Sequence, residues 1–94
     1  MELIDTHCHI DSATEEELSA IFLNADRVGV DRMICIGASR GIESSPAAVA
    51  LARRHARVWA TVGIHPQDAG KFSDMNSLLP LLSDSKVVAI GETG

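Results

Sequence analysis

Long hydrophobic runs are missing from this 94-residue sequence, and its opening stretch shows no signal-peptide pattern. No apolar run approaches the ~20 residues that cross a bilayer, and the opening stretch MELIDTHCHI lacks the basic segment and long apolar core of a signal peptide. We therefore expect a cytoplasmic protein with no membrane partner. Nothing in the sequence indicates an obligate protein partner.

Positive charge is also in short supply, because 8 Lys and Arg residues face 13 Asp and Glu residues, for a formal net charge of -5. An acidic chain has no global basic field for phosphate backbones, so any contact with nucleic acid has to come from a local site. Aromatic residues make up 3% of the chain, whereas hydrophobic residues make up 46% and charged residues 22%. This balance is typical of one small globular domain.

Cysteine is limited to Cys8 and Cys35, which form no spaced framework. Each lies in an apolar, strand-like run. Buried, reduced thiols are therefore expected rather than a disulfide.

Apolar runs with the periodicity of strands alternate with helical stretches along the chain. We expect strands at 2–7, 32–37, 58–64 and 86–91. Strands that alternate with helices predict an α/β fold, in which a parallel sheet has flanking helices.

Three helices are expected between these strands. Thr14 and Glu17 form a capping box at the start of the first, and Gly29 closes it. The second runs from about Pro46 to His55 with Ser45 as its N-cap. Pro80 interrupts the third, where a short or broken helix is expected. The core face of the first helix is predicted to hold Leu18, Ile21, Phe22, Ala25 and Val28.

The four predicted strands end near His9, Gly37, His65 and Glu92, at intervals of 28, 28 and 27 residues. One βα unit fits each interval, and eight such units make a (β/α)8 barrel of ~250 residues. We therefore expect residues 1–94 to be the N-terminal half of a TIM barrel, a βαβαβαβ portion of one domain truncated after its fourth strand.

The first strand carries two histidines one residue apart in LIDTHCHID. Strict alternation places Asp5, His7, His9 and Asp11 on one face of that strand, with Cys8 on the other. In a βα barrel the carboxyl ends of the strands form the catalytic mouth, where His65 and Glu92 would also arrive. Imidazole and carboxylate ligands suit zinc, manganese or iron, and one carboxylate can bridge two ions.

Each of these residues also has a structural explanation. The two histidines of the first strand can be exposed or hydrogen-bonded groups, Glu92 can be a surface loop carboxylate, and His65 can be a turn residue held by Pro66. The coincidence of all of them at strand ends favours metal binding.

Three segments, LIDTHCHID, VGIHP and VVAIGETG, resemble in order and spacing the N-terminal signatures of the TatD-type metal-dependent deoxyribonucleases, which belong to the amidohydrolase-like TIM barrels. The resemblance implies that His7 and His9 bind a first metal and that Glu92 bridges it to a second. It also implies that His65 faces the substrate phosphate, which makes His65 and Glu92 the catalytic residues. The remaining ligands of the family fall beyond Gly94.

By this resemblance, the protein hydrolyses phosphodiester bonds of DNA with water held between two divalent ions, Mg²⁺, Mn²⁺ or Zn²⁺. The Leu-Asp-Tyr that usually follows the third signature is absent, and Gln67 stands where many relatives have histidine. Two alternatives remain. The same pattern serves amidohydrolase-type hydrolysis of another ester, a lactone or an amide, or the chain is a non-catalytic truncated fragment. We expect the 94 residues alone to be inactive and prone to association.

Overall fold

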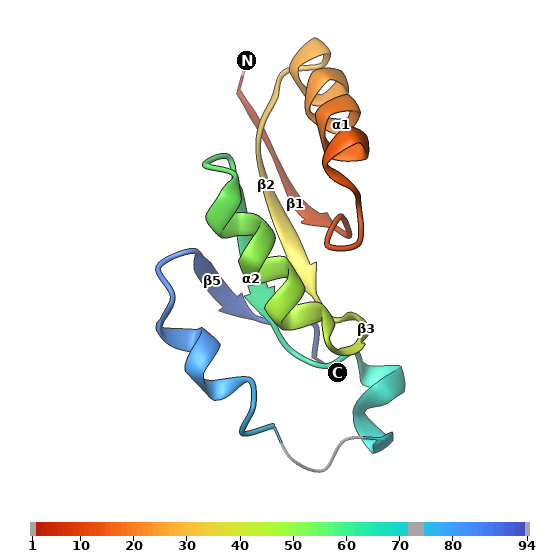
Figure 1. Ribbon diagram of the computed structural model, residues 1–94, viewed down its shortest axis with the longest axis vertical. Helices are drawn as coiled ribbons and strands as arrows, with labels where there is room; N and C mark the ends of the chain where they lie inside the picture. The colour runs from red at the N-terminus through yellow and green to blue at the C-terminus, as the bar shows by residue number, and fades with distance from the viewer. Residues whose placement is uncertain (1, 72–74, 94) are drawn as a thin grey trace.

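A computed structural model of the protein describes residues 2–71 and 75–93, and it shows one parallel sheet with helices packed on one face (Figure 1). The strands follow the order β1-β2-β4-β5, and every neighbouring pair is parallel. The elements are β1 (Leu3–Cys8), α1 (Glu15–Arg27), β2 (Val30–Gly37), β3 (Ser39–Ile42), α2 (Ser44–Arg54), β4 (Val58–Val62), η1 (Pro66–Lys71), η2 (Leu79–Ser83) and β5 (Val87–Ile90).

The first helix begins and ends where the sequence predicts. The Thr14 hydroxyl accepts from the Glu17 backbone N–H at 3.1 Å, and the Glu17 carboxylate accepts from the Thr14 N–H at 3.0 Å, which completes the capping box. At the other end Gly29 has φ 81°, a conformation that glycine adopts without steric cost. Leu18 and Ala25 are buried on the predicted face, but Val28 is 67% exposed because the helix has ended before it.

The second helix begins at Ser44, and its N-cap is Glu43, which makes no side-chain cap bond. The predicted N-cap at Ser45 is therefore wrong. Ser45 lies inside the first turn, fully buried, with its hydroxyl committed to the backbone of two strands. Figure 1 shows α2 in front of the middle of the sheet. It packs there on β2 and β4 through a face that combines Ala48 and Ala52 with the larger Val49 and Leu51.

The predicted break at Pro80 is confirmed, because the segment forms only the 3₁₀ helix η2 with Pro80 in its first turn. Two elements were not predicted, the 3₁₀ helix η1 after β4 and the strand β3. The short strand β3 follows β2 after a single residue, and it lies outside the four-stranded sheet.

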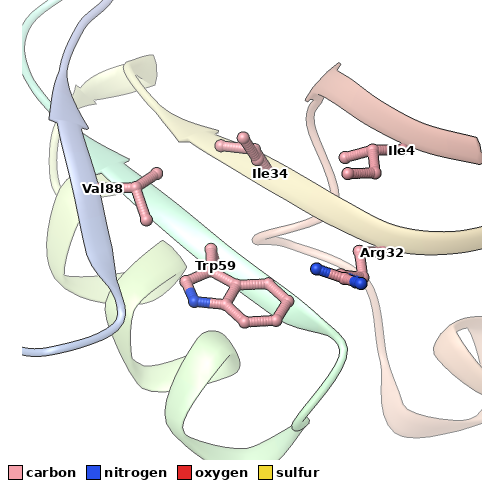
Figure 2. Close-up of a pocket in the computed structure, with 5 residues that line it drawn as sticks. All are labelled: Ile4, Arg32, Ile34, Trp59 and Val88. Carbon is pink, nitrogen blue, oxygen red and sulfur yellow. The ribbon is translucent and has the colours of Figure 1, made fainter.

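The hydrophobic core lies between the sheet and the helix layer. Its centre is formed by Leu18, Met33, Cys35, Leu51, Val58 and Ala60. Within residues 2–71 and 75–93 no helix covers the opposite face of the sheet, and Figure 2 shows side chains that line it. We call this surface the open face; it consists of Ile4, Arg32, Ile34, Trp59 and Val88.

Candidate metal centre

The two histidines of the first motif lie at the carboxyl end of β1. His7 is the second-last residue of β1, which ends at Cys8, and His9 comes directly after the strand. Their rings meet edge to face with centroids 5.0 Å apart, and both side chains are exposed. Two imidazoles thus converge on one accessible point, as alternation along a strand predicts.

Glu92 reaches the same point from the opposite edge of the sheet, because it lies two residues after β5 ends at Ile90. Its Oε1 is 3.7 Å from Nε2 of His7, and its Oε2 is 3.4 Å from Nε2 of His65. The carboxylate therefore lies between two imidazoles. The structure brings all four predicted site residues to one end of the sheet.

His7, His9 and Glu92 offer three ligand atoms that all lie within 4.8 Å of one another. Two neutral imidazole nitrogens and a carboxylate oxygen suit a divalent transition ion, and the spacing allows one ion to contact all three. This donor set fits a metal. The second oxygen of Glu92 faces His65 and stays available for a further ligand.

The strand ends that carry these residues are tied together by two buried hydroxyls. Thr61 in β4 accepts from the Gly37 backbone N–H at 3.2 Å and donates to the Gly91 carbonyl at 2.9 Å. Gly91 immediately precedes Glu92. Because Thr61 is 5% exposed, these bonds are shielded from water and fix the end of β5 against β2 and β4.

Ser45 has the corresponding role on the helix side. Its hydroxyl accepts from the Gly63 backbone N–H at 2.9 Å and lies 2.6 Å from the Gly37 carbonyl, to which it can donate. Gly63 itself allows a close approach, since a Cβ there would lie 2.6 Å from the Gly91 carbonyl oxygen. The backbone at Gly63, which leads to His65, therefore packs directly against the backbone at Gly91, which leads to Glu92.

The tautomer of His65 follows from its local hydrogen bond. The Gln67 backbone N–H donates to Nδ1 of His65 at 3.1 Å, so a neutral His65 ring carries its proton on Nε2. The same residue opens a turn, because the Asp68 backbone N–H donates to its carbonyl at 2.8 Å. His65 is thus both a turn residue and a donor aimed at the site.

The two aspartates of LIDTHCHID do not share the histidine face, which corrects the prediction from alternation. Asp5 pairs with Met33 and Cys8 with Cys35, so three residues of β1 span two of β2. This bulge turns Asp5 to the helix side, where it lines one cavity together with Cys8. Beyond the end of β1, Asp11 turns away as well and its side chain is 1% exposed.

Both cysteines are free thiols, as predicted. Cys8 packs against the core on the side away from the histidines, and its Sγ lies 3.4 Å from the Ile34 carbonyl. Burial, with the nearby Cys35, Asp5 and Asp11, raises the pKa of Cys8 to about 12. Burial also raises the pKa of Cys35. Neither sulfur is a thiolate at neutral pH, and neither belongs to the His and Glu cluster.

A polar cluster that sequence reasoning missed lies beside this centre. The Asp11 carboxylate accepts from the Ser39 hydroxyl at 3.1 Å, the Ser44 hydroxyl at 2.8 Å and the Arg40 guanidinium at 2.7 Å. The available signal was the run ASRGIESS directly after a strand end, in which one cation, Arg40, stands near three serines.

Comparison with known proteins identifies the family. The sequence profile of the family described as TatD related DNase matches residues 4–94. The chain belongs to this family. The predicted resemblance to TatD-type enzymes is therefore confirmed.

Two similar TatD relatives come from Cronobacter, and both are named 3'-5' ssDNA/RNA exonuclease TatD. The protein of C. turicensis is 40% identical over 85 residues, which cover 88% of this chain and 32% of that protein. The protein of C. sakazakii is 36% identical over the same length and shares of each chain. The chain therefore spans about a third of the TatD relatives that it matches.

A solved TatD homologue, YJJV of Escherichia coli, superposes with a TM-score of 0.80 and 32% identity. The match covers 96% of this chain and 36% of that one. The predicted fold class is confirmed: the parallel sheet and its helices correspond to the N-terminal part of a TatD TIM barrel. Within the described residues, no helix is long and apolar enough to span a membrane.

Proposed function

We propose that this chain supplies part of the active site of a metal-dependent phosphodiesterase that hydrolyses nucleic acid. The convergence of His7, His9 and Glu92 within 4.8 Å carries this proposal. Membership of the TatD related DNase family and relatives named ssDNA/RNA exonucleases support it. Because the chain spans about a third of those relatives, the proposal concerns the full-length gene product, whether it ends at Gly94 or continues.

In this proposal His7 and His9 hold one divalent ion together with Glu92, whose second oxygen can bind another ion. Mg²⁺, Mn²⁺ and Zn²⁺ are all candidates. When bound, such ions lower the pKa of water toward 7 and stabilise charge on the entering and leaving oxygens. Their positive charge also offsets the net charge of -5 at the place where a phosphate would bind.

His65 orients the phosphate. With Nδ1 occupied by the Gln67 N–H, the neutral ring presents Nε2–H to the site, 3.4 Å from Glu92. A phosphate oxygen that enters beside Glu92 can accept this proton in a hydrogen bond, and the donor is already positioned before substrate arrives. His65 is 31% exposed in its side chain, so it is open to a ligand but held by the turn.

The test is hydrolysis by the full-length gene product. A fluorescent single-stranded DNA, its RNA counterpart, and a panel of lactones and amides are assayed with each of the three ions. We expect cleavage of nucleic acid that depends on added metal and falls by at least about 100-fold in Glu92→Gln. The control Glu16→Gln, which removes an exposed carboxylate of α1, is expected to retain activity.

Each alternative has its own outcome. Turnover of lactones or amides without cleavage of nucleic acid would establish an amidohydrolase-type enzyme and overturn the proposal. A full-length product that binds no metal and cleaves none of these substrates would show that the chain is a non-catalytic fragment.

A further inference from the structure

Arg40 lies at the same end of the sheet as the candidate metal centre. It belongs to β3, which begins two residues after the carboxyl end of β2, and β2 neighbours the strand that carries His7. Its Nη2 is 2.7 Å from Oδ2 of Asp11, and Asp11 is two residues beyond His9. The guanidinium is therefore attached to the segment that leaves the site.

Several hydrogen bonds hold Arg40 and Asp11 together. The Asp11 carboxylate is 1% exposed and accepts from the Ser39 and Ser44 hydroxyls as well as from Arg40. The Arg40 backbone N–H also donates to the Ser44 hydroxyl at 3.1 Å. The loop and its cation are thus fixed before any ligand binds.

Arg40 nevertheless keeps most of its binding capacity. Its side chain is 48% exposed, and the bond to Asp11 uses one of the five guanidinium N–H donors. A planar guanidinium with free donors can bind a phosphate through two parallel hydrogen bonds.

The placement of the other cations makes Arg40 stand out. Because the strands are parallel, each helix end that precedes a strand lies at the amino edge of the sheet, away from the metal ligands. Six of the eight Lys and Arg residues, all of which the structure describes, belong to that edge or to the segments leading to it. They are Arg27, Arg32, Arg53, Arg54, Arg57 and Lys86.

Only Arg40 and Lys71 lie on segments that follow the carboxyl end of a strand, and all eight cations lie in the described part of the chain. Lys71, at the end of η1, is 71% exposed and bonded to Asp68 of the same short helix. Arg40 is therefore the better-positioned cation near the site.

We infer that Arg40 binds a backbone phosphate of the nucleic-acid strand next to the cleaved linkage, an inference that rests on the proposed function. A nucleic acid carries one negative charge per nucleotide, so a strand held at the metal centre brings further phosphates over the neighbouring β2 side of the rim. The acidic chain offers little other positive charge there. Arg40 would thus favour polynucleotides over isolated phosphodiesters.

The test compares Arg40→Gln, Arg40→Lys and the control Arg27→Gln in the full-length gene product. The control Arg27→Gln removes the same charge from the amino edge of the sheet. Among the contacts described, Arg27 contacts only Asn24. Substrates are a 12-nucleotide single-stranded DNA at several KCl concentrations and bis(p-nitrophenyl) phosphate, which has one phosphate. Binding of the labelled DNA is measured separately by anisotropy in EDTA.

For Arg40→Gln we expect KM for the DNA to rise about tenfold with kcat nearly unchanged, and binding in EDTA to weaken similarly. The salt dependence should become shallower by about 0.7 in the slope of log affinity against log KCl concentration. Arg40→Lys should restore part of the loss. With the single-phosphate diester, kcat/KM of Arg40→Gln should fall by less than about twofold. Arg27→Gln should match the wild type in affinity and in kcat/KM.

Equal losses on DNA and on the single-phosphate diester would overturn the inference, because they indicate a disturbed metal centre rather than a lost phosphate contact. Wild-type affinity and salt dependence in Arg40→Gln would also overturn it. If the wild-type protein cleaves no nucleic acid, the proposed function fails. The anisotropy measurement then still decides whether Arg40 contacts the strand.

Discussion

His7 and Glu92 approach within 3.7 Å although they come from opposite edges of the sheet. Three strand spacings of ~4.8 Å separate β1 from β5, so the strands would lie about 14 Å apart in a flat sheet. The contact exists because both residues follow or end their strands at the carboxyl end of the sheet, where their side chains reach toward each other. The metal ligands therefore depend on correct pairing of all four strands, and metal binding should report on the tertiary structure as well as on the ligands.

Replacing both His7 and His9 with alanine should remove at least one equivalent of bound metal. Each substitution takes away an imidazole nitrogen from the cluster, and Glu92 alone cannot hold an ion firmly. Both side chains are exposed, so the fold should persist. Metal content is measured by mass spectrometry of the full-length gene product and the fold by circular dichroism. Cys8→Ala, on the opposite side of β1, should keep its metal; full metal content in the double variant would disprove the ligand assignment.

Gly63→Ala should damage the site from a distance. The new methyl group would lie 2.6 Å from the Gly91 carbonyl oxygen, so the backbone before Glu92 must move. We expect a loss of about 1–3 kcal/mol in the free energy of unfolding and weaker metal binding. Gly70→Ala is a matched control, because a Cβ there meets nothing within 4 Å. Urea denaturation and metal titration of both variants provide the measurement, and equal behaviour of the two would contradict the packing argument.

The two thiols should resist alkylation while the protein is folded. Burial raises the pKa of Cys8 to about 12 and also raises that of Cys35, so both side chains are mainly thiols at pH 8. Iodoacetamide labelling followed by mass spectrometry should be slow without urea and fast in 8 M urea. Rapid labelling of either thiol in the folded protein at pH 8 would show that the strand and helix layers open readily around it.

Asp84 should contribute stability that disappears in acid. The Lys86 backbone N–H and then the Arg53 guanidinium hold the pKa of Asp84 below its usual value of 3.8. A folded pKa below the unfolded one means that the contribution is present above about pH 4 and is lost as pH falls through the lower folded value. Asp84→Asn should therefore be less stable than the parent at pH 7, and the difference in free energy of unfolding should shrink as the pH falls below about 4. A constant difference across this range would assign the effect to packing.

Much of the fold is encoded in local signals. The capping box of Thr14 and Glu17 satisfies its hydrogen bonds within four residues, and a proline in a helix interior removes a backbone hydrogen bond, so both features could be predicted. Ser45 could not be. The same residue type caps an exposed helix or bonds strands from within a buried turn, and only the packing of α2 on the sheet decides between these roles.

The site likewise has features that the sequence predicts and features that it does not. His7, His9, His65 and Glu92 follow strand ends, and parallel strands bring their carboxyl ends together, so sequence alone predicts that they gather. The position of Asp5 depends on a one-residue bulge in the pairing of β1 with β2, which no periodicity within β1 reveals. The bond between Asp11 and Arg40 joins segments 29 residues apart, and it arises from the loop after β2 rather than from any repeat.

The last prediction concerns the open face of the 94-residue chain studied by itself. Ile4 and Val88 are 51% and 50% exposed there, with Ile34 and Trp59 between them. The edge strands β1 and β5 also present backbone groups on their outer sides that no other strand of the sheet pairs. Apolar side chains beside open edges favour association of chains. We therefore expect oligomers at micromolar concentration, detected by analytical ultracentrifugation.

The double variant Ile4→Lys, Val88→Lys places charge on this face and should shift the chain toward monomer. Val28→Lys, which alters a residue that is 67% exposed at the end of α1, should leave the distribution unchanged. A parent chain that sediments as a monomer would show that the open face is adequately solvated and does not drive assembly.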